Sequence, residues 1–488
     1  MRVLLVYPNL MMQTQLPVNL SLLSAYLKYN DHVVKLFDTT FYCTESKSVD
    51  EKRVERLQVK PTNPGDVGIV FKDTGVYDDF RDMIKSFKPD LVAVTFIDDT
   101  LKLAYDLLEY TLDVPVVAGG ISCILSPEKI LENMNIDYVC VGEGEHAIVG
   151  LCNYLESGDV LLEDVPNLAY RDDDGKIVYT VMCPLLDLDD LLFEDYSIFD
   201  DKRFYRPMID KMVKSIPINL DRGCPYSCSF CCASALKDRY TDRYYRVKTV
   251  DRVRDELEYQ IGLYDPDFIY FNSESFFVRT VNMLKELGDM YKQFGIPFWC
   301  QGNVGCLSDE KLRIVKKMGV ATVSVGVECG NEFYRGNMLN KHFSNDRLLS
   351  EVDLFKKYDI PVSFNNIIGL PDETRDLIFE TILLNRLIFK KHGRSSFNGF
   401  IFQPYRNTKL WYYCKKMGYI DDDTRTDTLL GNPVVYNPFI SDEELFGLLR
   451  TFVMYIKMPY QLLPSVFEAE DDDIVFEQML EKYYELYE

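Results

Sequence analysis

The sequence predicts an α/β protein with a Rossmann-like N-terminal domain, a partial (β/α)6 barrel and a mainly helical C-terminal region. Short apolar runs alternate with helix-like segments over residues 1–150, and again from about 215 to 418. The strand-like runs are apolar almost throughout, as is typical of parallel sheets that helices cover on both faces. After residue 418 the chain becomes acidic and rich in tyrosine, with helical spacing.

The first alternation covers residues 1–150. We expect helices at 16–30, 101–112 and 126–134, and the strand-like runs lie at 2–8, 32–38, 90–96, 114–120 and 137–145. A polar stretch from about 44 to 78 interrupts the pattern. Gly119, Gly120 and Gly142 follow expected strands, at the sheet edge where open α/β sheets bind ligands.

Residues 151–210 read as a connector, in which 167–180 forms two short strands around an Asp-Gly turn. Residues 211–418 form the expected barrel, with its active site at the carboxyl ends of the strands. Its strand candidates are 215–220, 268–272, 297–302, 321–328, 362–369 and 397–404, and clear helices are expected at 249–264 and 372–392. Residues 419–488 form the helical C-terminal region.

Three cysteines stand after the first barrel strand, in the run LDRGCPYSCSFCCAS. Cys224, Cys228 and Cys231 have the spacing C-x3-C-x2-C, which suits three irons of a 4Fe-4S cluster and leaves the fourth iron open. A structural zinc site would need a fourth ligand, and the nearest histidines are His146 and His342. Three small buried apolar residues are the other alternative.

This cysteine run, with an aromatic residue before its third cysteine, resembles the signature of the radical S-adenosylmethionine (SAM) enzymes. The N-terminal pattern resembles the cobalamin-binding domain fused to many of them, through P-x-N-L near the start, the Gly119–Gly120 turn and the GEGE run. The domain lacks the D-x-H-x-x-G motif, so we expect cobalamin to bind without a histidine ligand. The resemblance implies cobalamin contacts at Asn9, Thr95, Gly119, Gly120, Ser122, Gly142 and Glu143.

The same resemblance places SAM contacts at the ends of successive barrel strands. It implies the residues Phe230, Glu274, Gln301, Glu328, Arg335 and Ile368. Glu274 takes the acidic position of a turn whose usual first Asp is Ser273 here, and Glu328 lies in a near match to the family's GxESG. Arg335 is expected to meet the SAM carboxylate through its forked guanidinium, and Ile368 to pack on adenine.

The resemblance implies an enzyme that cleaves SAM reductively at the cluster to a 5′-deoxyadenosyl radical, and that methylates an unactivated carbon or a phosphorus of a small molecule or peptide. A cobalamin-dependent cyclase or rearrangement enzyme is the first alternative. A cobalamin-free RNA-modifying enzyme is the second, although the chain shows no second cysteine triad and no basic RNA module. A cobalamin or redox sensor would need an output domain, and none is evident.

The net charge of −23 and the pI near 4.7 disfavour nucleic acid and anionic membrane as partners. Thirteen scattered cysteines and a short apolar start indicate a cytoplasmic protein. The electron donor is expected to be a flavodoxin or ferredoxin. A basic run at 237–248 offers such a donor, or an anionic cosubstrate, a place to dock, unless it is only a solvated turn.

Overall fold

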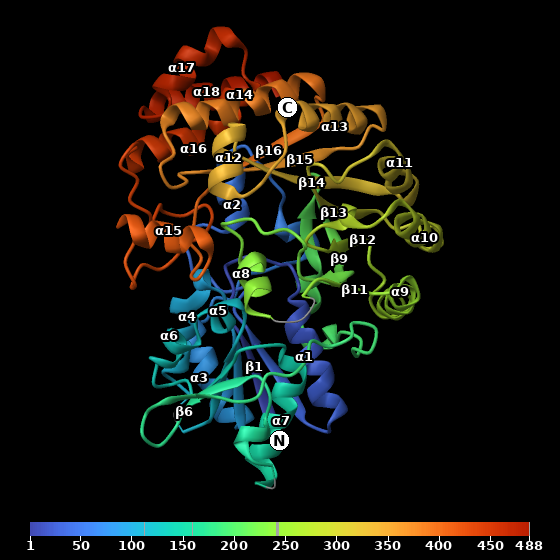
Figure 1. Cartoon of the computed structure of the whole chain (residues 1–488), viewed down its shortest axis with the longest axis vertical. Coiled ribbons are helices and arrows are strands. Elements are labelled where there is room, and N and C mark those ends of the chain that lie inside the picture. Colours follow the sequence, from blue (N-terminus) through green and yellow to red (C-terminus); the bar gives the residue numbers. More distant parts are fainter. Residues whose placement is uncertain (112, 159, 241–243, 488) are drawn as a thin grey trace.

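Two α/β units are stacked along the long axis of the molecule (Figure 1). The computed structural model describes residues 1–111, 113–158, 160–240 and 244–487. Residue 112 of the expected helix 101–112, residues 241–243 of the basic run and residue 488 lie outside the described residues. The expected α/β class, with a helical C-terminal region, is confirmed.

The N-terminal sheet has seven strands in the order β2-β1-β3-β4-β5-β6-β7. Neighbours among the first five strands pair in parallel, and the last two strands pair antiparallel. The strands are β1 (Arg2–Tyr7), β2 (Val33–Asp38), β3 (Leu91–Thr95), β4 (Val116–Gly119), β5 (Tyr138–Cys140), β6 (Leu168–Arg171) and β7 (Ile177–Tyr179). The parallel part has the 2-1-3-4-5 order of doubly wound folds, which bind ligands beyond the carboxyl ends of the strands.

Helices cover both faces of this sheet because alternate strand residues point to opposite sides. Val3 and Leu5 of β1 pack under α1 (Val18–Tyr29) and α7 (Gly144–Ser157). Leu4 and Val6 pack on the other face, under α3 (Val76–Phe87), α4 (Leu101–Leu108) and α6 (Pro127–Leu131). The helix expected at 126–134 is the shorter α6, and a further short helix, α5 (Ile121–Leu125), precedes it.

The connector expected at 151–210 is divided between the two units. Its hairpin, β6 and β7, extends the N-terminal sheet through antiparallel pairing with β5. The turn between the two strands carries Gly175 at φ +77°, which suits the Asp-Gly sequence. Further on, β8 (Tyr205–Met208) joins the barrel sheet, and residue 150 falls within α7.

The second sheet is a half-barrel with the strand order β16-β15-β14-β13-β12-β9-β8. Its six parallel strands are β9 (Lys211–Asn219), β12 (Phe268–Asn272), β13 (Phe298–Asn303), β14 (Val320–Glu328), β15 (Val362–Ile368) and β16 (Ser395–Ile401). Each overlaps one expected strand. β8 adds an antiparallel edge beside β9, so β8 and β16 are the two free edges of the half-barrel.

Helices surround the outer face of the half-barrel (Figure 1). They are α9 (Val250–Tyr264), α10 (Val281–Tyr291), α11 (Asp309–Met318), α13 (Asn345–Lys357) and α14 (Arg375–Lys391). In the C-terminal region, α16 (Asp442–Lys457) packs on α14 and β16, and α17 (Leu463–Glu468) and α18 (Asp473–Tyr487) follow. No helix of the described residues is long and apolar enough to cross a membrane.

The polar stretch of the N-terminal domain leaves its own sheet and joins the barrel. Its helix α2 (Val49–Glu55) lies among the barrel elements near β16 (Figure 1). Gln58 donates from Nε2 to the carbonyl of Gly399 on β16, at 2.7 Å. Further along, η1 (Pro64–Val67) packs against β9, and Ile69 packs with Tyr205 and Met212. Residues 45–72, here the closing segment, therefore touch both edges of the half-barrel.

Candidate active site

One cavity of about 370 Å³ lies where the carboxyl ends of the two sheets face each other. From the N-terminal domain it is lined by Thr95, by the Gly119–Gly120 turn and by α1. From the barrel it is lined by residues at the ends of β9 and β12, among them Asn272 and Glu274. The strand ends of the two domains thus share one space, with the glycine turn on one side and Glu274 on the other.

Glycines form the wall of this cavity on the side of the N-terminal domain. Gly120 has φ +115°, and a Cβ there would lie 2.4 Å from the carbonyl oxygen of Phe96. At Gly142 a Cβ would lie 2.7 Å from the side chain of Asn167. Only glycine fits at these positions, so the backbone itself forms the wall. None of the described residues that line the cavity is a histidine.

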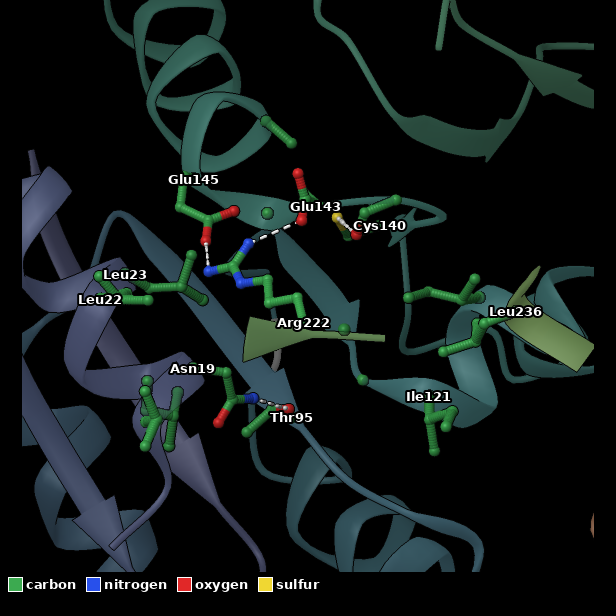
Figure 2. A pocket seen from close by; sticks show the side chains of 18 of the residues that line it. Asn19, Leu22, Leu23, Thr95, Ile121, Cys140, Glu143, Glu145, Arg222 and Leu236 are labelled. Carbon is green, nitrogen blue, oxygen red and sulfur yellow. Dashed lines mark hydrogen bonds and ion pairs between the residues drawn. The ribbon is translucent and has the colours of Figure 1, made fainter. Parts of the chain in front are cut away.

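Asn19 stands at the start of α1, where the resembling family usually has glycine. Its side-chain amide donates to Thr95 Oγ1 at 3.2 Å, and both residues line the cavity (Figure 2). The substitution therefore adds a polar group to the wall rather than a steric block.

The GEGE run carries an ion-pair network that joins the two domains. Arg222 lies between Glu143, at 2.7 Å, and Glu145 (Figure 2). Arg246, opposite Arg222 in the pair of β10 (Asp221–Arg222) and β11 (Arg246–Val247), reaches Glu143 at 2.6 Å. Burial opposes the charge on Glu143, yet hydrogen bonding from Arg246 and the nearby Arg222 guanidinium lower its pKa. We call these four residues the interdomain clamp.

The cysteine loop follows directly from β10 and ends at α8 (Cys232–Arg239). Cys224, Cys228 and Cys231 are half-buried free thiols. Burial raises the pKa of Cys224 to about 12 and that of Cys231 to about 11, and it raises the pKa of Cys228 as well. The thiols must lose their protons to ligate iron, so cluster binding would couple to proton release.

Main-chain hydrogen bonds fix this loop against the barrel rim. Ser229 donates to the carbonyl of Leu339 at 2.9 Å and accepts from the backbone of Leu410 at 3.0 Å. Phe230 packs in a small apolar cluster with residues such as Trp411, so it supports the loop from outside the cavity. No three His, Cys, Asp or Glu side chains of the described residues converge closely enough for a single metal ion; thiolates bound to separate irons of a cluster need not do so.

Glu274 is the expected SAM contact that does line the cavity. Burial, with the charge of Asp221 adding to it, raises the pKa of Glu274. Ser273, which replaces the usual Asp, donates to Asp221 at 2.5 Å, and Arg279 pairs with Asp221 at 2.7 Å. The rim thus retains a buried carboxylate, that of Asp221, but this carboxylate is paired with Arg279.

Glu328 ends β14 at a bulge in the pairing with β15 and has φ +67°. This left-handed conformation is costly for a side chain other than glycine or asparagine. Lys341 holds the carboxylate at 2.8 Å and also donates to the carbonyl of Gly326 at 2.8 Å. Gln301 lies half-buried on β13, facing the barrel interior.

Several expected contacts do not line the cavity. Arg335 is fully buried, and its guanidinium donates to the carbonyls of Cys329, at 2.6 Å, and Phe343, at 2.5 Å. Ile368 is fully buried in the main core. Asn9 binds Thr40 and the carbonyl of Gln13 instead. Ser122 lines a neighbouring cavity of about 430 Å³ with Asp98 and Arg406.

Other lining residues were not foreseen. Arg222 is the Arg of DRGC, and its place beside the cysteine motif was the available signal. Tyr240 and Tyr244 stack at 5.3 Å between ring centroids and also line the cavity. Both belong to the run 237–248, whose positive charges and not its tyrosines drew attention in the sequence.

Two family models match the chain. The B12 binding domain matches residues 16–152, and the radical SAM superfamily matches residues 218–384. Both lie on the units described above, and the cavity lies between them. The cofactors are therefore a 4Fe-4S cluster, SAM and cobalamin, and the glycine wall and the three thiols suit them.

Three characterised or classified relatives show the range of reactions. The chain is 29% identical, over 63% of its length, to the anaerobic magnesium-protoporphyrin IX monomethyl ester cyclase of Rubrivivax gelatinosus, and spans 56% of that protein. It is 24% identical to an uncharacterised methyltransferase of Pyrococcus horikoshii, covering 80% of this chain and 84% of that one. It is 22% identical to the cytidylyl-2-hydroxyethylphosphonate methyltransferase of Streptomyces wedmorensis, covering 71% and 70%.

Solved structures agree on the fold. TsrM of Kitasatospora setae, a radical SAM methyltransferase with cobalamin and a 4Fe-4S cluster bound, matches with a TM-score of 0.63 at 17% identity, covering 85% of this chain and 75% of that one. OxsB, with aqua-cobalamin and SAM bound, matches with a TM-score of 0.65 at 14% identity, covering 96% and 70%.

Proposed function

We propose that this chain, which belongs to the cobalamin-dependent radical SAM enzymes, transfers a methyl group to an unactivated carbon, or to a phosphorus, of a small molecule or peptide. The observation that carries the proposal is the single cavity between the domains. Thr95 and Gly120 line one side of it, and Asn272 and Glu274 line the other. A substrate atom in that space would be within reach of both cofactor sites.

When bound, SAM at the cluster supplies a one-electron route to an unactivated bond, and cobalamin supplies a methyl carrier. The chain's own residues then orient the cofactors and enclose the space between them. Cys224, Cys228 and Cys231 hold the cluster after losing their protons. The interdomain clamp fixes the distance between the domains, and the Gly120 backbone forms a wall without side chains.

Two more residues keep the rim in place. Lys341 neutralises Glu328 and binds the strand carbonyl beside it, so it fixes the bulge at the end of β14. The carboxylate of Glu274 has no hydrogen-bond or ion-pair partner among the described residues and remains available to a polar group of SAM. A flavodoxin- or ferredoxin-type donor in a reducing cytoplasm would supply the electron.

Methyl transfer is supported by two methyltransferase relatives that align over 70% or more of their own length. A ring-forming reaction is the second candidate, because the cyclase has the highest identity among the three relatives described above. The two reactions differ in product mass, since only methyl transfer adds a methylene equivalent to the substrate.

The first experiment is anaerobic purification and reconstitution with iron, sulfide and hydroxocobalamin, followed by desalting and metal analysis. We expect about four irons and one cobalamin per chain. SAM with a deuterated methyl group is then incubated with the holoenzyme and small-molecule extracts. Label in a product supports methyl transfer; turnover without label in any product favours the cyclase reaction, and absence of bound cobalamin contradicts both.

A further inference from the structure

The interior of the half-barrel below the rim is lined by uncharged polar side chains. The strand register places asparagine side chains of neighbouring strands side by side on the inner face, because paired residues of parallel strands point to the same face. Asn272 pairs with Asn219, and its amide donates to the Asn219 side chain at 2.7 Å. On the other side Asn398 pairs with Asn365 and donates to its side chain at 2.8 Å. A hydrogen-bonding surface thus leads inward from the cavity.

The floor beneath these amides is aromatic and cationic. Tyr270, one inward position below Asn272, stacks on Trp299 with centroids 4.1 Å apart. The guanidinium of Arg206 from β8 lies over the Tyr270 ring at 4.6 Å. Tyr270 is two residues before Asn272 in β12, which corresponds to about 7 Å along the strand. The floor therefore lies directly below the rim.

The closing segment brings a second arginine to this floor. Arg53 of α2 faces Arg206 and Tyr270, together with Asp50 one helical turn earlier. Arg53 keeps 30% of its side-chain surface accessible, yet burial lowers the pKa of its guanidinium. The guanidinium is thus partly desolvated by its neighbours, while the side chain can still be reached by a ligand.

These arginines lack the acceptors that they need. The main chain of Arg206 pairs with Val213 of β9, but its guanidinium makes no hydrogen bond or ion pair with any described residue. The single carboxylate near Arg53, Asp50, is 3.7 Å away, and the Nε atom of Arg53 is buried without a partner. Two guanidinium groups thus face one carboxylate. An enclosed, unpaired guanidinium is costly, because arginine cannot lose its charge. A cation–π contact recovers only about 2 kcal/mol.

We propose that the floor of the barrel binds an anionic group of the substrate, a carboxylate or a phosphate, between Arg53 and Arg206. The planar fork of arginine matches both oxyanions. The uncharged part of the substrate then lies along Asn219, Asn272 and Gln301, and its far end reaches the rim. Only the identification of the bound anion as part of the substrate rests on the proposed function. The anion site itself is inferred from the residues of the barrel floor.

Trp299 provides a reporter for this site. The chain has two tryptophans, so Trp411→Phe leaves Trp299, stacked on Tyr270, as the single one. The reconstituted W411F protein is titrated with sodium phosphate and, separately, with sodium glutarate, with sodium chloride keeping the ionic strength constant. We expect a saturable change in Trp299 emission. Saturation by one salt alone identifies the oxyanion class; saturation by neither overturns the proposal.

Variants locate the binding. The double variant Arg53→Gln/Arg206→Gln should lower the affinity for the anion at least about tenfold, since each charged hydrogen bond contributes about 1.5–3 kcal/mol. Arg206→Lys should recover only part of the affinity because lysine lacks the fork. Arg254→Gln, which removes an exposed guanidinium of α9, is the matched control. Unchanged saturation in the double variant would overturn the assignment.

Two further measurements distinguish a loss of anion binding from misfolding and from a failure of the proposed function. Iron and cobalamin content show whether the variants keep the cofactor sites. Should the double variant not fold, Asp50→Asn provides an independent test, because loss of the competing carboxylate should tighten anion binding by several-fold, and weaker binding would contradict the proposal. Anion binding without any methylated product would leave the floor site standing and remove the proposed methyl transfer.

Discussion

The rim and the floor of the barrel use arginine in opposite ways. At the rim Arg222 is paired with carboxylates, Arg279 is paired with Asp221, and Arg335 is surrounded by main-chain carbonyls. At the floor Arg206 has no such partner among the described residues, and Arg53 has a distant one. Guanidinium groups that bind carboxylates or carbonyls at hydrogen-bonding distance hold the architecture, whereas those without such a contact mark where we propose that a ligand binds. The same residue type therefore has two meanings in one barrel.

The largest expected effect is at the cluster loop of the rim. Cys228→Ala removes one of three iron ligands, so SAM cleavage to 5′-deoxyadenosine should fall to background. Cobalamin content and anion binding at the floor should remain, since neither site includes this thiol. Chromatography of the nucleoside product and metal analysis measure both. Cleavage retained in this variant would reject the cluster assignment, and Cys232→Ala is the neighbouring control.

The next largest effect tests whether the rim arginines are structural. Arg222→Gln leaves Glu143 and Glu145 without this partner, and breaking such a buried pair costs about 3 kcal/mol. We expect a clearly lower Tm and a loss of cobalamin. Replacing all four clamp members together, as Arg222→Met, Glu143→Met, Glu145→Met and Arg246→Met, should recover part of the stability. Arg206→Gln at the floor, by contrast, should leave Tm unchanged or raised, because it removes an unpaired charge. A destabilised Arg206→Gln protein would break the comparison.

A smaller effect concerns the wall opposite the rim. Gly120→Ala introduces a Cβ 2.4 Å from the Phe96 carbonyl oxygen at φ +115°, a strain of about 1–3 kcal/mol. Cobalamin affinity should fall roughly tenfold or more. Gly262→Ala on α9 is the control, since a Cβ there would meet nothing within 4 Å and the residue lies outside the cavity. Equal cobalamin retention in the two variants, measured by absorbance after desalting, would argue against the backbone wall.

The smallest effect is a pH dependence at the rim. Burial raises the pKa of Glu373, which accepts from the backbone of Leu370 at 3.1 Å, to about 8. Because the folded state binds this proton more tightly than the unfolded state does, the group costs stability increasingly as pH rises from about 4.5 to 8. Glu373→Gln should therefore raise Tm at pH 8.5 relative to wild type, and the gain should shrink toward pH 5. A gain that is constant with pH would contradict the buried carboxyl.

The strands and the cluster loop could be predicted from the sequence because their signals are local. An apolar run ending in Gly119–Gly120, and three closely spaced cysteines, carry their meaning within a few residues. The interdomain clamp could not be predicted, since Glu143 and Arg222 are 79 positions apart. Arg335 was expected to contact SAM because of the family resemblance, but a resemblance of sequence does not say which side of the helix faces the core.

The closing segment was the least predictable part. Its polar residues show neither strand nor helix periodicity, so 44–78 could only be described as an interruption. Its place is set by tertiary contacts, such as Gln58 with Gly399, that follow from the open edges of the half-barrel. Unpaired strand edges require a cover, and the sequence does not state which segment provides it.

That the closing segment belongs to the N-terminal domain has a consequence for how such enzymes diversify. Part of the chamber that selects the substrate is encoded in the first hundred residues, upstream of the cysteine motif. A chimera that exchanges barrels at the domain boundary would keep the donor's strands but retain the host's Arg53. We therefore expect substrate preference to depend on residues 45–72 as well as on the barrel. Family trees built from the barrel alone should then group enzymes that act on different molecules.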